Sequence, residues 1–267
     1  MVTRSDELTI LEFELKHLAE LVINNSMERW LPNYTPLGTH SAHFNRYKWV
    51  SQFVKDKAVL DLACGSGYGS KMLIEIGEAK SVLGGDLSNE VIDYCRAKHK
   101  TLSNLTFVQL DACKFNIENK FDLIVSFETI EHLLEVELFL ANIKNSLKNK
   151  ASFVLSTPIS KKSIDHNPEN PHHLIEWDIP TFLYLIEKNG FVVQKKFIQP
   201  YKIEFRPQGI AARIKRRVLK LIKKDKFKKL DDFSIIEMDK DTHLWQKQIN
   251  DNKIGGYVIL ICKTSKI

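Results

Sequence analysis

The stretch "VLDLACGSGYGS", residues 59–70, decides the fold that this chain is expected to adopt. Its apolar start suits a buried strand, its middle is a glycine-rich turn, and a helical pattern begins at its end. Gly65 and Gly67 let the backbone turn tightly and approach a ligand closely. Such glycines alone are also compatible with a plain tight turn. Asp86, however, ends the next predicted strand about 20 residues later, where a carboxylate can accept hydrogen bonds from both ribose hydroxyls. The combination predicts the nucleotide-binding end of a parallel sheet.

Short apolar runs alternate with helical patterns along the rest of the chain. Strands are predicted over residues 58–62, 81–86, 105–110, 121–127, 151–157, 191–197 and 257–263. Helices are predicted over residues 68–76, 89–100, 135–149 and 179–191, the last with an Asn189-Gly190 stop signal. This alternation predicts an α/β fold with a Rossmann-like, doubly wound, seven-stranded, mostly parallel sheet and helices on both faces.

Three segments lie outside this alternation within a single predicted domain, residues 1–267. Residues 1–50 are expected to form an N-terminal helical cap or lid. Residues 158–178, rich in Pro, Asn and His, are expected to form an active-site loop over the carboxyl ends of the strands. Residues 200–250 are expected to be a basic helical insertion before the last strand.

The composition is that of a globular chain, with 267 residues of which 43% are hydrophobic and 27% charged. No run approaches the ~20 apolar residues that span a bilayer. Acidic residues interrupt the N-terminal segment where a signal peptide would be apolar. The four cysteines show no CxxC spacing, which favours reduced thiols over disulfides or a zinc site. We therefore expect a cytoplasmic protein.

Several short motifs indicate which nucleotide is bound. A dinucleotide fingerprint needs glycine at position 70, where this chain has Ser70. "LDLACGSGYGS" instead resembles motif I of the class I S-adenosylmethionine (SAM)-dependent methyltransferases. "GGDLS" resembles their second motif and "LDACKF" the segment that borders adenine, so the resemblance covers roughly residues 40–200. It implies SAM as the cofactor, with contacts from Asp61, Ala63, Gly65, Gly67, Asp86, Leu87, Asp111, Ala112 and Phe127.

The segment "FETIEHL", residues 127–133, places Glu128, Glu131 and His132 just after the fourth predicted strand. A helical turn there would project all three from one side, and such a set suits a divalent cation. "FETIEH" together with the later "HLIEW" resembles the metal site of the small-RNA 3′-terminal 2′-O-methyltransferases. That resemblance implies that Glu128, Glu131, His132 and His173 hold magnesium or manganese.

We expect catalysis from His132, His173 and Glu128, by one of two routes. A cation lowers the pKa of an acceptor hydroxyl and fixes its orientation. Without a metal, His132 or His173 serves as a general base. A third interpretation gives these residues a structural role only, in capping a helix and bonding the loop.

A second resemblance concerns the acceptor. "MERWLPNY", "HFNRYKWV", "VSFETIEHL", "LSTP" and "NPHHLIEW" resemble bacterial methyltransferases encoded among cell-surface polysaccharide genes. This implies methyl transfer to a hydroxyl of a nucleotide sugar or of a growing, lipid-linked glycan. Residues 27–46 would then form a lid over the SAM site. Arg46 would pair with the methionine carboxylate of SAM, and Tyr47 would assist in binding it. Arg46 is equally compatible with a surface cation.

Two other functions are alternatives to sugar methylation. One is an RNA ribose 2′-O-methyltransferase, and the other is a non-catalytic SAM-binding scaffold of a glycan assembly complex.

The basic segment 209–229 is the feature most particular to this chain. Its apolar residues form one helical stripe, and its other face carries many Lys and Arg residues. Such a helix suits the inner face of an anionic membrane or, alternatively, RNA phosphates. A core-packed helix with a solvated basic face is the third interpretation.

Overall fold

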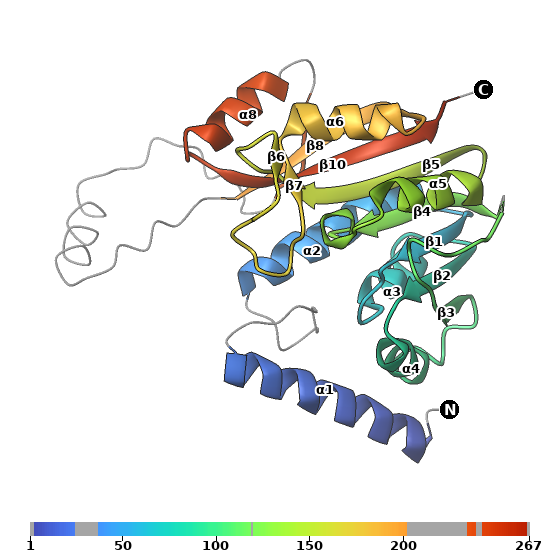
Figure 1. Cartoon of the computed structure of the whole chain (residues 1–267). Helices are drawn as coiled ribbons and strands as arrows, with labels where there is room; N and C mark the ends of the chain where they lie inside the picture. Colours follow the sequence, from blue (N-terminus) through green and yellow to red (C-terminus); the bar gives the residue numbers. More distant parts are fainter. Residues whose placement is uncertain (1–2, 25–36, 119, 202–233, 239–241, 266–267) are drawn as a thin grey trace.

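The computed structural model describes residues 3–24, 37–118, 120–201, 234–238 and 242–265. One sheet organises the molecule, with strands in the order β3-β2-β1-β4-β5-β10-β8-β9 (Figure 1). Its eight strands are β1 (Ala58–Leu62), β2 (Ser81–Asp86), β3 (Leu105–Gln109), β4 (Phe121–Phe127), β5 (Leu147–Pro158), β8 (Phe191–Tyr201), β9 (Ile236–Glu237) and β10 (Gly255–Thr264). All the predicted strands form, and β9 adds two residues at one edge.

The sheet is parallel from β3 to β5. Strand β10 is antiparallel to both of its neighbours, β5 and β8. The carboxyl ends of β1, β2 and β4 therefore lie at one edge of the sheet, where ligands of doubly wound folds bind. The predicted Rossmann-like, mostly parallel sheet is confirmed.

Helices cover both faces, and two buried apolar clusters hold them there. One cluster joins the sheet to α5 (Val136–Ser146) and α6 (Ile179–Lys188). The other joins it to α2 (Leu37–Val50), α3 (Tyr68–Glu75) and α4 (Asn89–Lys98). Central strands buried on both faces explain why their sequences are continuously apolar.

The helix ends follow local sequence signals. The Ser88 hydroxyl accepts a hydrogen bond from the Val91 N–H, 3.4 Å away, at the start of α4. The Asp178 carboxylate accepts one from the Thr181 N–H, 2.9 Å away, at the start of α6. Helix α6 ends before Gly190, which adopts a φ of +84°. Side-chain caps and a left-handed glycine are the common start and stop of a helix.

The three segments outside the alternation are partly described. Residues 1–50 contain α1 (Arg4–Asn24) and α2, and α1 lies along α4 with the Phe13 and Tyr94 rings stacked 4.3 Å apart (Figure 1). Loop 158–178 contains the short antiparallel strands β6 (Ile164–Asp165) and β7 (Glu176–Trp177). Helix α8 (Thr242–Asn250) belongs to the insertion. The basic segment 209–229 lies outside the described residues.

Among the described helices, none combines the length and apolar character needed to span a bilayer.

Candidate active site

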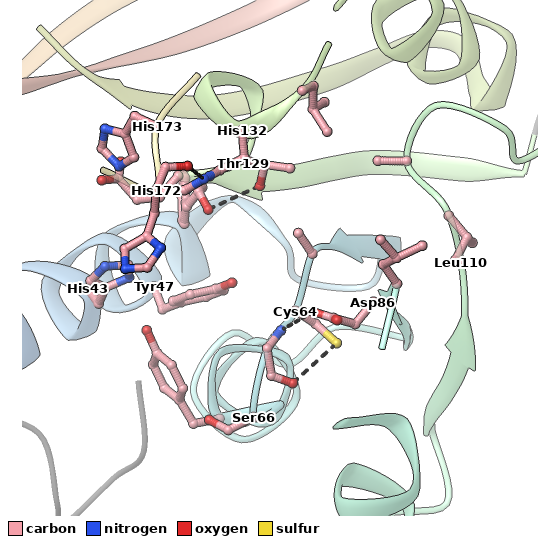
Figure 2. A pocket seen from close by; sticks show the side chains of 18 of the residues that line it. His43, Tyr47, Cys64, Ser66, Asp86, Leu110, Thr129, His132, His172 and His173 are labelled. Atoms are coloured by element: carbon pink, nitrogen blue, oxygen red, sulfur yellow. Dashed lines mark hydrogen bonds between the residues drawn. The ribbon is translucent and has the colours of Figure 1, made fainter. Parts of the chain in front are cut away.

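A cavity of about 440 Å³ lies at the carboxyl ends of the parallel strands. Figure 2 shows His132, His172 and His173 gathered on one side of it, and Cys64, Ser66 and Asp86 on the other. The predicted residues that line it are Tyr47, Ala63, Gly65, Asp86, Leu87, Asp111, Ala112, Phe127, Glu128, His132 and His173. The predicted residues Arg46, Asp61, Gly67 and Glu131 are not part of its lining.

The glycine turn after β1 has an unusual backbone. Ala63, Gly65 and Gly67 all adopt left-handed φ angles, of +62°, +53° and +72°. A Cβ atom at Gly67 would lie 2.9 Å from the Phe107 ring and 3.0 Å from Cys95 Sγ, whereas one at Gly65 would meet nothing within 4 Å. Gly67 is therefore required by packing, and Gly65 leaves an open approach to the backbone from the cavity.

Asp86 is held in place by backbone donors. Its Oδ2 accepts from the Gly65 N–H and its Oδ1 from the Ser88 N–H, both at 3.0 Å. Each carboxylate oxygen keeps a second lone pair, and the side chain borders the cavity. Asp86 can therefore accept further hydrogen bonds from ligand hydroxyls, as the sequence predicts.

The adjoining wall is built by Leu87, Leu110, Asp111 and Ala112. Leu87 is 65% exposed, which is high for a leucine beside a cavity. The Asp111 Oδ1 accepts from the Cys113 N–H at 2.9 Å, which fixes the carboxylate at the rim. An apolar wall with a carboxylate at its border suits a flat purine.

Asp61 lies behind the cavity, fully buried. It accepts hydrogen bonds from the Tyr47 hydroxyl at 2.9 Å and from the Ser70 hydroxyl at 2.5 Å. Burial raises the pKa of Asp61 to about 6, against the opposing effect of these two donors. In this structure Asp61 positions Tyr47, which lines the cavity, and is not itself at the surface of the site.

Arg46 is also fully buried, so the alternative of a surface cation is wrong. Its Nη1 donates to Gln199 Oε1 at 2.8 Å, and its guanidinium lies 4.5 Å from the centre of the Tyr257 ring. Its Nη2 lies 3.8 Å from Glu128 Oε1. Nε and Nη2 have no hydrogen-bond partner among the described residues. The guanidinium is thus placed behind the cavity wall and retains unused donors.

Glu128 does not join the other residues of its motif. The short 3₁₀ helix η2 covers only Ile130–His132, and Glu128 precedes it with a left-handed φ of +52°. Its Oε1 accepts from the Ser156 hydroxyl at 3.0 Å. Because Glu128 lies outside this helix, it does not project from the same side as Glu131 and His132, contrary to the expectation from the sequence. Its carboxylate points toward Ser156 and Arg46 instead. Burial raises the pKa of Glu128, with Arg46 opposing the shift.

Glu131, His132 and His173 do come together. One potential ligand atom from each lies within 4.8 Å of the others. Glu131 is fully buried, its Oε2 accepts from the Thr157 hydroxyl at 3.2 Å, and its Oε1 has no hydrogen-bond partner among the described residues. Burial, and then the charge of Glu128, raises the pKa of Glu131 well above its usual value.

Hydrogen bonds fix the orientation of both imidazoles. His132 Nδ1 lies 2.8 Å from the His172 carbonyl oxygen, so that nitrogen carries the proton. His173 Nδ1 lies 2.6 Å from Glu176 Oε1, and its Nε2 lies 2.8 Å from Asn170 Nδ2. The Asn170 Oδ1 accepts from the His172 N–H, so the amide nitrogen donates to His173.

Sequence reasoning missed further residues that line the cavity: His43, Tyr68, Asn170, His172 and Tyr257. Asn170 and His172 lie in the "NPHHLIEW" segment, whose polar composition marked a loop over the site. Tyr257 begins an apolar run that indicates only a strand. Burial lowers the pKa of His43 well below its usual value, so this imidazole is neutral.

The sheet order and the cleft at its carboxyl edge define a class I methyltransferase fold. The chain belongs to the methyltransferase domain family, whose model matches residues 53–190, just over half of the 267-residue chain. Membership implies SAM as the methyl donor.

Two relatives illustrate how far the similarity extends. A "Probable S-adenosylmethionine-dependent methyltransferase" of Mycolicibacterium smegmatis is 27% identical over 177 residues, 62% of this chain and 65% of the relative. N-methyltransferase 4 of Papaver somniferum is 31% identical over 121 residues, 43% of this chain and 34% of the relative. The chain thus spans less than two thirds of the length of these curated relatives.

Solved structures share the fold. The cyclase SpnF superposes with a TM-score of 0.60 at 14% identity, over 99% of this chain and 98% of that one. Phosphoethanolamine N-methyltransferase 2 of Haemonchus contortus superposes with a TM-score of 0.53 at 16% identity, over 84% of this chain and 53% of that one. Because the first of these proteins is named a cyclase, the fold by itself does not define the reaction.

Proposed function

We propose that this chain transfers the methyl group of SAM to a hydroxyl of a sugar during the synthesis of a surface glycan. One observation carries the proposal: beside the residues suited to SAM, the cavity ends in a polar wall of oriented imidazoles, the Asn170 amide and the Glu128 carboxylate. Such a wall suits an acceptor with hydroxyl groups and offers little to an apolar one. The resemblance to enzymes of surface-polysaccharide synthesis points the same way.

The cofactor side of the cavity is suited to SAM. Asp86 would accept hydrogen bonds from the ribose hydroxyls, and Leu87 with Asp111 and Ala112 would border the adenine. The open turn at Gly65 would lie against the methionine portion. SAM supplies, when bound, a sulfonium methyl carbon that an acceptor oxygen can attack. The chain's own task is to orient that oxygen and to take its proton.

We assign the role of general base to His132. With its proton on Nδ1, its Nε2 carries the lone pair that accepts the hydroxyl proton. The Nε2 of His173 already accepts from the Asn170 amide. The His172 carbonyl orients His132 through its Nδ1, the His173 ring packs edge-on against it with ring centres 4.8 Å apart, and His132 takes the proton.

As the alternative route to the same reaction, we propose that Glu131, His132 and His173 hold a divalent cation such as Mg²⁺ or Mn²⁺, in which case His132 is a ligand and does not act as the base. The residues fit such an ion, because one potential ligand atom from each lies within 4.8 Å of the others, and Glu131 Oε1 is buried without a described hydrogen-bond partner. An ion there would lower the pKa of the acceptor hydroxyl. Glu128, part of the predicted ligand set, lies outside this group, since it bonds Ser156 and faces Arg46.

A label-transfer assay tests both proposals. The purified protein and methyl-labelled SAM are incubated with envelope glycolipids and, separately, with total RNA, each with and without EDTA. We expect label in the glycolipid; its loss with EDTA would favour the cation route, and its persistence with EDTA would favour His132 as the base. Label in RNA alone would favour the RNA ribose alternative. No label in any fraction, although SAM binds, would favour a soluble nucleotide-sugar acceptor or a non-catalytic scaffold.

Two variants distinguish the site from its surroundings in that assay. His132→Gln is expected to lower the rate about 100-fold while SAM still binds, because the proton acceptor is lost. His243→Gln, at an exposed position on α8, is the matched control and should be unaffected. An unchanged rate in His132→Gln would contradict the role of His132.

The acceptor is proposed to be lipid-linked, with the chain bound peripherally at the inner face of the membrane. The support is the sequence of segment 209–229, whose basic amphipathic pattern suits anionic lipid. Replacement of Arg216 and Arg217 by Gln should weaken sedimentation with phosphatidylserine vesicles, by about 1 kcal/mol per cation. Equal sedimentation of the variant and the unmodified chain would contradict the proposal.

A further inference from the structure

An aromatic surface continues outward from the acceptor end of the cavity. Tyr257 lines the cavity together with Asn170, His172 and His173. The ring centre of Tyr201 lies 5.6 Å from that of Tyr257, with 48° between the ring planes. Tyr201 is 38% exposed, so it extends the surface of Tyr257 toward solvent.

The fold holds these two rings in place. Tyr201 on β8 pairs with Gly255 on β10, and a Cβ atom at position 255 would lie 2.3 Å from the Tyr201 ring. The Tyr201 ring therefore lies directly over a residue without a side chain. Arg46 stacks 4.5 Å from the Tyr257 ring centre and is itself fully buried, so it supports Tyr257 from the protein side.

Carboxylates of the cavity wall and of loop 158–178 act on the aromatic pair. Glu176 holds His173, Glu169 precedes Asn170 in the same loop, and Glu128 borders the cavity. Burial, and then the charges of Glu176, Glu128 and Glu169, raises the pKa of the Tyr201 phenol, so all three carboxylates act on this ring. Among the described residues that line the cavity, none is Lys or Arg.

We propose that Tyr201 and Tyr257 bind the acceptor as an uncharged sugar ring, with no phosphate on the ring that enters the cleft. The C–H face of a sugar packs on aromatic rings, and its hydroxyls donate to carboxylates and to the Asn170 amide oxygen. The same carboxylates repel a phosphate, and the described lining residues include no Lys or Arg to compensate. This inference rests on the proposed function and narrows its acceptor to a neutral glycan residue.

The test is saturation-transfer NMR on the full chain with S-adenosylhomocysteine present. The probes are neutral methyl glycosides of common hexoses and 6-deoxyhexoses, each matched with its sugar 1-phosphate. We expect saturation transfer to the ring protons of at least one glycoside, and none to its phosphate. Because binding is measured without turnover, failure of methyl transfer in the label assay is a separate result.

Three variants complete the experiment. Tyr201→Ala should weaken glycoside binding about tenfold, and Tyr201→Phe should retain it, because the face and not the hydroxyl is used. Tyr184→Ala, at a tyrosine 67% exposed on α6, is the matched control and should bind normally. Unchanged binding in Tyr201→Ala, preference for the phosphates, or no transfer to any glycoside would each overturn the inference.

Discussion

The two ends of the cavity are built in different ways. At the cofactor end, the backbone forms the site: the glycine turn has left-handed φ angles, and its Gly65 N–H donates to Asp86. At the acceptor end, side chains and a carbonyl of one loop orient the imidazoles: Asn170 and Glu176 hold His173, and the His172 carbonyl holds His132 from 40 positions along the chain. Contacts made by backbone groups depend little on side-chain identity, whereas the contacts at the acceptor end change when one of these side chains is replaced.

Asp86→Ala should produce the largest effect and the clearest separation of the two ends. Loss of the carboxylate removes the proposed ribose contacts and leaves the Gly65 N–H without its acceptor. We expect SAM binding to weaken at least about 100-fold, as measured by calorimetry. Asp93→Ala, on the exposed face of α4, is the control and should bind SAM normally. Normal binding in Asp86→Ala would mean that the cofactor end is assigned incorrectly.

Glu131→Gln tests the acceptor end alone. The amide keeps the shape of the buried carboxyl but cannot ionise, so it cannot offer a carboxylate to a cation held with His132 and His173. Turnover should fall about 100-fold, whereas the Kd for S-adenosylhomocysteine should stay within about twofold. Glu137→Gln, at an exposed position on α5, is the matched control. A parallel loss of cofactor binding in Glu131→Gln would show that the two ends are not separable.

The buried carboxyl behind the cofactor end predicts a dependence of stability on pH. The pKa of Asp61 is raised from 3.8 to about 6, so its neutral form favours folding. Protonated Asp61 therefore adds about 3 kcal/mol to the free energy of unfolding. This stabilisation is fully present below pH 3.8 and is lost as the pH rises through 6. Asp61→Asn is uncharged at every pH because an amide does not ionise, and its oxygen can still accept a hydrogen bond from Tyr47.

The free energy of unfolding of Asp61→Asn, relative to that of the unmodified chain, should therefore rise by about 2–3 kcal/mol between pH 4 and pH 8. Urea titrations at several pH values measure it. Asp93→Asn, at the exposed site used above, should show no such trend. A difference independent of pH would contradict the raised pKa of Asp61.

Two glycine substitutions probe the turn itself, and one of them gives the smallest expected loss of stability. Gly67→Ala places a Cβ atom 2.9 Å from the Phe107 ring at a φ of +72°, and Gly65→Ala meets no atom within 4 Å at a φ of +53°. We expect unfolding free energies lower by about 2–3 kcal/mol and about 1 kcal/mol, respectively. Chemical denaturation compares them directly. Equal losses would mean that backbone strain alone, and not packing, explains the need for Gly67.

The difference between the two ends of the cavity also explains which features could be predicted from the sequence. The strands and the glycine turn were predictable, because each is encoded by residues adjacent in the chain. The separation of Glu128 from Glu131 was not, since it depends on a left-handed residue that ends β4 before η2 begins. The burial of Arg46 was not predictable either, because its partner Gln199 lies in β8, far along the sequence.

The acceptor end shows the same limit. Tyr257 and Tyr201 are brought together only by the pairing of β10 with β8, and no local pattern distinguishes them from other strand tyrosines. Asn170 and Glu176 come from a loop whose composition indicates its position but not its hydrogen bonds. Long-range pairing, which a single sequence does not display, therefore decides this half of the site.

The position of β10 also has a consequence for synthesis on the ribosome. This strand lies between β5 and β8, yet it is translated after both of them. Until residues 255–264 leave the ribosome, the nascent chain exposes the facing edges of β5 and β8, which are prone to pair with other chains. A polypeptide stalled before residue 255 would contain the glycine turn and Asp86 but lack Tyr257. Translation thus completes the acceptor half of the site last.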